Sequence, residues 1–170
     1  MIRVHSYESM GTFDGPGLRL VVFLQGCNFR CLYCANPDTI DTKGESTETA
    51  IDEIVHMAVS QKAFFGKKRR CDFQRRRDYI ASKSTDSVIP AVKKNKNIHI
   101  CIDTNGSIWN EEVEELLKWT DLVLLDIKEF NNVRHRQLTE RSNEQTIRTA
   151  GWLEKNGKPF LVALCISSRL

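Results

Sequence analysis

The chain has 170 residues, 41% of them hydrophobic, which suits one folded domain with a buried core and excludes a disordered chain. Its 25 Lys and Arg residues nearly balance its 22 Asp and Glu residues, so the formal charge of +3 does not indicate binding to nucleic acid or to an anionic membrane. The sequence shows neither the apolar segment of a signal peptide nor the roughly 18 apolar residues of a membrane span. We therefore expect a cytoplasmic protein whose six cysteines are thiols or ligands rather than disulfides.

Strand and helix patterns alternate along the chain. The apolar run LRLVVFLQG (18–26) predicts a buried strand that leads directly into the cysteine-rich segment CNFRCLYC (27–34). Further helices are predicted at 48–65, 110–120 and 146–157, and further strands at 97–106, 121–128 and 158–166. This alternation is typical of βαβ units, so the sequence predicts an α/β fold with a parallel sheet, formed by residues 1–170 as a single domain.

Polar residues follow three of the predicted strands. The cysteines come after the first strand, Asp103 and Thr104 lie near the end of a second, and Asp126 and Lys128 end a third. Ligands of parallel sheets bind at the carboxyl ends of the strands, so we expect these groups to share one site.

The cysteines of CNFRCLYC have the spacing C-x3-C-x2-C, with no fourth cysteine close behind. Three thiolates on one loop can bind three irons of a 4Fe-4S cluster and leave the fourth iron open to a substrate. A structural zinc site normally has four ligands, and the four histidines show no matching pattern. Zinc and thiol redox chemistry at the C-x2-C pair nevertheless remain alternatives on spacing alone.

The segment HSYESMGTFDGPGLRLVVFLQGCNFRCLYCANPDT (5–39) places an aromatic residue, Tyr33, directly before the last cysteine of the motif. With NIHICIDTNG, TDLVLLDIK and NGKPFLV, this segment resembles the radical S-adenosylmethionine (SAM) enzymes, and among them the activating enzymes of glycyl-radical enzymes. The resemblance implies a partial (βα) barrel of the radical SAM type.

The resemblance also implies an activity and its cofactors. Cys27, Cys31 and Cys34 would bind a 4Fe-4S cluster, and SAM would bind the fourth iron. Reductive cleavage of SAM would yield a 5′-deoxyadenosyl radical, which would take a hydrogen atom from a glycine loop of pyruvate formate-lyase. The electron donor would be a flavodoxin or a ferredoxin, and the activating protein would be a monomer. A different glycyl-radical partner, such as an anaerobic ribonucleotide reductase, is the alternative.

The resemblance assigns roles to further residues. Tyr33 would contact the adenine of SAM, and Lys128 would meet the SAM carboxylate. A monovalent cation near the methionyl group would be bound by Asp103, Thr104 and Asp126. Oxygen ligands suit such a cation.

Other interpretations of these residues remain open from the sequence alone. Asp14, in the DGPG turn, would help to receive the glycine loop of the partner, although an aspartate there is also a common turn former. Asp103 can cap a turn, Lys128 can be a solvated charge, and Tyr33 can be an ordinary packed aromatic residue.

The segment 69–92 departs from the resemblance. The family carries a glycine-rich GGE stretch there, which binds the amino group of SAM, whereas this chain is arginine-rich and predicts a poor central strand. One permitted set of codons for RRCDFQRRRDY, when it is translated from one base later, encodes GGVTFSGGE followed by isoleucine. One permitted set of codons for SKSTDSVIPAV, translated with the same one-base shift, encodes AKALIPLFQL. We therefore predict that 69–92 is aberrant and out of frame.

The carboxyl-terminal residues ALCISSRL (163–170) behave in the same way, because permitted codons read RYVLVPGL one base later. On this interpretation the barrel is incomplete at the C-terminus, Cys71 and Cys165 are products of the wrong frame, and Cys101 is a core residue. The basic run at 67–77 lacks the interleaved aromatic residues of a single-strand binder, so we predict no nucleic-acid partner. An inactive, metal-binding remnant is the alternative function.

Overall fold

The computed structural model describes residues 1–12, 17–64, 70–76, 85–96 and 98–164. Within these residues the strands form one seven-stranded sheet in the order β3-β1-β2-β4-β5-β6-β7. The predicted partner-binding residue Asp14 and the predicted aberrant residues 165–170 lie outside the described part of the chain.

Five strands of the sheet run parallel to one another, as the sequence predicts. They are β2 (Arg19–Cys27), β4 (Arg70–Arg76), β5 (His99–Thr104), β6 (Leu122–Ile127) and β7 (Phe160–Leu164). Two antiparallel strands, β1 (Ile2–Gly11) and β3 (Thr47–Thr49), extend the sheet beyond β2. Since β3 and β7 are its outer strands, the sheet of the described residues is not closed, which confirms the expectation of an α/β fold with a partial barrel.

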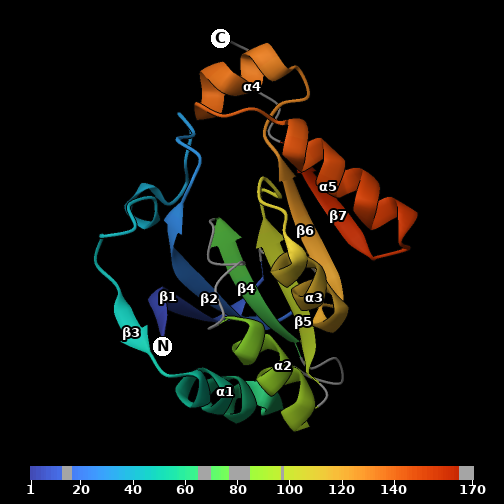
Figure 1. Cartoon of the computed structure of the whole chain (residues 1–170). Helices are drawn as coiled ribbons and strands as arrows, with labels where there is room; N and C mark the ends of the chain where they lie inside the picture. Colours follow the sequence, from blue (N-terminus) through green and yellow to red (C-terminus); the bar gives the residue numbers. More distant parts are fainter. Residues whose placement is uncertain (13–16, 65–69, 77–84, 97, 165–170) are drawn as a thin grey trace.

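Helices lie beside the sheet and beyond one end of it (Figure 1). The chain forms α1 (Ile51–Ser60), α2 (Thr85–Lys96), α3 (Glu111–Trp119), α4 (Asn132–Thr139) and α5 (Glu144–Lys155), with short 3-10 turns at Pro37–Thr39 and Gln61–Ala63. In Figure 1, α1, α2, α3 and α5 lie against the sheet, whereas α4 stands past the end of β6. The helix α4 therefore lies near the carboxyl ends of the parallel strands, where the cysteine segment follows β2.

The core lies between one face of the sheet and these helices. Alternate strand residues point to it, as the two-residue period of a strand requires, including Leu20, Val22 and Leu24 of β2 and Val123 and Leu125 of β6. The buried apolar stripes of the helices complete this layer. Burial of this apolar surface is the main contribution that holds the sheet and the helices together.

The segment 69–92, expected to make a poor central strand, supplies one through its described residues 70–76. β4 pairs in parallel with β2 on one side and with β5 on the other. Parallel pairing uses main-chain groups, which every residue except proline provides in full, and β4 contains no proline.

The second half of this segment begins α2 and contributes to the core. Val88, Ile89 and Val92 are fully buried in the core. Their spacing of one and three positions places them on one face of a helix, even though Pro90 lies inside the same helix.

Candidate functional site

The cysteine-rich segment and the ends of two other strands line one small pocket. Cys27 ends β2 and Cys31 and Cys34 follow it, while Asp126 belongs to β6 and Lys128 comes directly after that strand. Phe29 and Asn105 complete the lining. The carboxyl ends of parallel strands lie at one edge of the sheet, which is why residues about 100 positions apart meet here.

The Cys31 thiol of this pocket is held in its protonated form. Burial, as the largest cause, raises the pKa of Cys31 to about 11, and the neighbouring Cys27, Cys34 and Asp126 also raise it, against an opposing effect of Lys128. A bound metal cation would lower the pKa of the Cys31 thiol instead, because thiol ligands release their protons when they bind a metal. Metal binding at this loop is therefore coupled to proton release.

The donor set fits an iron–sulfur cluster better than a single metal ion. In the described part of the chain, no three His, Cys, Asp or Glu side chains are arranged to hold one ion. The cysteines of a 4Fe-4S cluster bind different irons, so their sulfurs need not converge on one point. Three soft thiols in one pocket, with Lys128 to balance negative charge, match that requirement.

Asp126 and Lys128, which both line the pocket, form an ion pair in which their side chains are only 15% and 12% exposed. The Lys128 ammonium also lies 5.9 Å from the centre of the Tyr33 ring, and the Tyr33 hydroxyl donates a hydrogen bond to the Lys128 carbonyl (3.2 Å). The structure thus brings together three of the residues singled out from the sequence. Tyr33, which belongs to the cysteine segment, thus packs against Lys128 at the end of β6.

Asp103 and Thr104 lie on opposite faces of β5. Thr104 lines a small apolar cavity on the helix side of the sheet with Ile102 and residues of α3, so the side chain of Asp103 points to the other face. The Thr104 hydroxyl accepts a hydrogen bond from the Gly106 N–H (3.1 Å). Of the three predicted cation ligands, only Asp126 lines the cysteine pocket itself.

A hydrogen-bonded network that sequence reasoning missed joins the cysteine segment to the turn after β5. Asn105 Nδ2 donates to Asn28 Oδ1 (3.0 Å), and Asn28 Nδ2 donates to Ser107 Oγ (2.7 Å). The Ser107 N–H and hydroxyl both donate to Asn105 Oδ1 (3.0 and 2.7 Å). Asn28 follows Cys27 directly, so this network fixes the start of the cysteine segment against β5.

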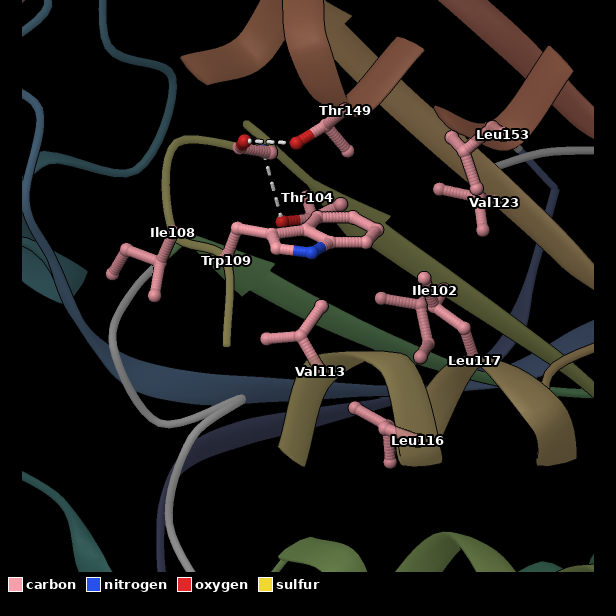
Figure 2. A pocket seen from close by; sticks show the side chains of 11 residues that line it. Ile102, Thr104, Ile108, Trp109, Val113, Leu116, Leu117, Val123, Thr149 and Leu153 are labelled. Carbon is pink, nitrogen blue, oxygen red and sulfur yellow. Dashed lines mark hydrogen bonds between the residues drawn. The ribbon is translucent and has the colours of Figure 1, made fainter. Parts of the chain in front are cut away.

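The helix α5 holds the same turn from the other side (Figure 2). The Thr149 hydroxyl donates to the Gly106 carbonyl (2.7 Å), and the Thr146 hydroxyl donates to the Asn105 carbonyl (2.7 Å). Figure 2 also shows Trp109 and Val113 beside the apolar cavity, with Thr149 at its rim. Both threonines are almost fully buried, so the turn is fixed by two buried hydrogen bonds.

Comparison with known proteins assigns the family of this pocket. The family model of the radical SAM superfamily matches residues 21–166, which include all three cysteines and the strands β4 to β7. The chain belongs to the radical SAM superfamily. The family implies SAM and an iron–sulfur cluster as cofactors, in agreement with the donor set of the pocket.

Among curated radical SAM proteins, the chain is similar to "Pyruvate formate-lyase 1-activating enzyme" of Escherichia coli K12. The two are 35% identical over 170 residues, which cover 94% of this chain and 65% of that protein. It is also 37% identical to "Pyruvate formate-lyase-activating enzyme" of Staphylococcus epidermidis, over 94% of this chain and 66% of that protein. The chain thus spans about two thirds of the length of these relatives.

Solved structures support the fold. The Streptococcus suis protein SuiB, bound to S-adenosylmethionine, aligns with a TM-score of 0.72 at 13% identity, over 91% of this chain and 35% of that one. QueE from Escherichia coli aligns with a TM-score of 0.52 at 15% identity, over 96% of this chain and 83% of that one. Among the described helices, none has the length and apolar character to cross a membrane.

Proposed function

We propose that this chain is a cytoplasmic, monomeric radical SAM activating enzyme that generates a glycyl radical on pyruvate formate-lyase. The observation that carries the proposal is the single pocket formed by Cys27, Cys31, Cys34, Asp126 and Lys128. The named activity of the two relatives supports the choice of partner. The pocket supports this type of chemistry, because it brings three thiols and the Lys128 ammonium together at the carboxyl ends of the parallel strands.

The three cysteines are the proposed ligands of a 4Fe-4S cluster, and SAM is the proposed ligand of its open iron. When bound there, the cluster and SAM supply a 5′-deoxyadenosyl radical that takes a hydrogen atom from a glycine of the partner enzyme, with a flavodoxin or ferredoxin as the electron source. The three cysteines would bind iron as thiolates, so their protons would be released on binding. The network of Asn28 would hold the residue that follows Cys27 against the turn after β5 while iron binds.

Lys128 is the proposed partner of the SAM carboxylate. In the described structure Asp126 neutralises the Lys128 ammonium, so a carboxylate that replaced Asp126 at Lys128 would satisfy the same charge. The released Asp126 carboxylate, with Asp103 and Thr104, would then be available to a monovalent cation. The Thr104 hydroxyl lies on the helix side of β5, opposite the side chain of Asp103, so it can join that site only if the end of β5 rearranges.

Two further residues are proposed to have the roles that the family resemblance implies. Tyr33 is proposed to contact the adenine of SAM, and the distance of 5.9 Å between its ring centre and the Lys128 ammonium supports this proposal. Asp14 is proposed to help receive the glycine loop of the partner.

Anaerobic reconstitution of the 170-residue chain tests the proposal. We expect a brown protein with about four irons and four sulfides per chain, and release of 5′-deoxyadenosine from SAM after reduction. Cys31→Ala should abolish the cluster. The matched control Cys101→Ala removes a cysteine that is fully buried in β5 and is not part of the pocket, so it should keep the cluster.

The outcomes separate this proposal from its rivals. A chain that takes up iron or zinc but neither binds nor cleaves SAM would be a metal-binding remnant. Radical formation on anaerobic ribonucleotide reductase and not on pyruvate formate-lyase, followed by electron paramagnetic resonance, would assign the other partner. Sequencing the gene across codons 65–95 and beyond codon 163 tests the prediction that 69–92 and 163–170 are out of frame. A corrected frame that encodes GGVTFSGGE would confirm it.

A further inference from the structure

A buried histidine outside the pocket belongs to a hydrogen-bonded cluster at the end of α4. His135 is fully buried, and its ring meets the Phe29 ring edge-on, with 5.2 Å between the ring centres. His135 Nδ1 lies 2.7 Å from the Arg141 carbonyl oxygen and 3.1 Å from Thr139 Oγ1. Phe29 lies in the cysteine segment, two positions after Cys27, so this histidine packs directly against the proposed cluster-binding loop.

The protons of this cluster can be assigned from its acceptors. A carbonyl oxygen only accepts hydrogen bonds, so His135 Nδ1 carries the proton. The Thr139 hydroxyl donates to the His135 carbonyl (2.8 Å) and accepts from the Arg141 N–H (3.2 Å). Burial lowers the pKa of His135, which keeps the ring neutral. The result is one defined tautomer that ties the start of the last turn of α4 to the residues just after it.

This fixed helix end holds the cysteine segment by main-chain hydrogen bonds. The last carbonyl groups of a helix have no partner within the helix. Here the Leu138 carbonyl accepts the Leu32 N–H (2.9 Å), and the Thr139 carbonyl accepts the Arg30 N–H (2.9 Å). Arg30 and Leu32 flank Cys31 directly. The side chain of Arg141 adds a third link, because its Nε donates to the Asn28 carbonyl (3.1 Å).

We propose that the end of α4, ordered by His135 and Thr139, is a clamp that positions the cysteine loop before iron binds. His135 is a positioning residue in this proposal, since it acts on the loop through Phe29 and through the Leu138 and Thr139 carbonyls. The link from this clamp to a cluster rests on the proposed function. The clamp itself is a property of the metal-free chain.

Hydrogen exchange of the metal-free chain tests the clamp without any cofactor. His135→Leu places an apolar side chain of similar size at this buried position and removes the Nδ1–H donor. His135→Asn keeps an N–H donor close to the position of Nδ1. We expect the Arg30 and Leu32 amides to exchange at least tenfold faster in His135→Leu, with protection largely restored in His135→Asn. Gln137→Ala, at an exposed position of the same helix, should match the wild type.

Thr139→Val provides a second variant of nearly unchanged shape, in case His135→Leu does not fold. It should accelerate exchange of the same two amides and leave the amides of β5 and β6 protected. The clamp is refuted if the Arg30 and Leu32 amides are unprotected in the wild type. It is also refuted if both variants exchange these amides at the wild-type rate.

A second readout connects the clamp to the cluster. In reconstituted protein, we expect a chelator to remove iron about 10 to 100 times faster from His135→Leu than from the wild type or from Gln137→Ala. Failure of the wild type to take up iron would contradict the proposed function and leave the exchange result in force. Equal iron loss in all variants, with faster exchange in His135→Leu, would refute the influence of the clamp on the cluster.

Discussion

Substitution of Gly106 by alanine tests how tightly the turn after β5 is packed under the site. The backbone of Gly106 has φ of +61°, and an added Cβ would lie 2.6 Å from Leu125 Cδ1 and 3.2 Å from Thr149 Cγ2. The left-handed backbone costs an alanine about 1 kcal/mol, and overpacking of a buried contact costs about 1–3 kcal/mol. We therefore expect Gly106→Ala to lower the free energy of unfolding by about 2–4 kcal/mol.

Two other glycines separate these contributions. Gly157 has the same φ of +61° but no atom within 4 Å of an added Cβ, so Gly157→Ala should cost only the backbone part, about 1 kcal/mol. Gly151 lies inside α5 with no atom within 4 Å of an added Cβ, so Gly151→Ala should stabilise the chain by about 0.5–1 kcal/mol. The series therefore compares backbone strain with and without a steric contact.

Urea unfolding of the metal-free chain, followed by circular dichroism, measures the three differences. With a urea dependence of about 2 kcal/mol per molar, Gly106→Ala should move the midpoint down by roughly 1–2 M. Equal losses for Gly106→Ala and Gly157→Ala would refute the reasoning, because they would mean that Leu125 moves aside at no cost. A neutral Gly106→Ala would show that the turn itself is not held as described.

Three further predictions concern the site and its supports. The raised pKa of Cys31 favours the protonated thiol in the folded state, so stability should fall as the pH rises from roughly 9 to about 11, and less so in Cys31→Ala, as measured by urea unfolding across this range. Thr146→Val should leave the buried Asn105 carbonyl without its donor and cost about 1–2 kcal/mol in the same assay, whereas Ile147→Val, on the exposed side of α5, should cost less than 1 kcal/mol. Glu140→Gly should relieve a left-handed backbone (φ of +61°) and raise the thermal midpoint by a few degrees, and a lowered midpoint would count against strain at this helix end.

The main elements of the fold could be predicted because their sequence patterns are strong. The apolar run that forms β2 and the alternating strand and helix patterns after residue 97 correspond to elements of the structure. β4 was missed because its composition is unfavourable for a central strand, yet it contains no proline, so its main chain can pair with both neighbours. The helix α4 was missed because its residues are mostly polar, although Asn131 caps its first turn through Val133 and Arg134.

Only part of the candidate site could be predicted from the sequence. The spacing of the three cysteines and the strand-end position of Lys128 are local signals, and the structure brings them into one pocket. The link between Asn28 and Asn105 joins residues 77 positions apart, and no local pattern announces it. The opposite orientations of Asp103 and Thr104 follow from the two-residue period of a strand, so that signal was present in the sequence.

The position of α4 also sets the order in which the site can form. Most strand pairs of the parallel sheet join elements that follow one another along the chain, so β2, β4, β5 and β6 can pair in turn as they emerge during synthesis. The cysteine segment must wait longer, because the link from Arg141 to Asn28 spans 113 positions. A nascent chain that ended before residue 139 would carry all three cysteines without the helix end that orders them. On the proposed role of this helix end, competence to take up iron would be acquired late in synthesis, after most of the sheet already exists.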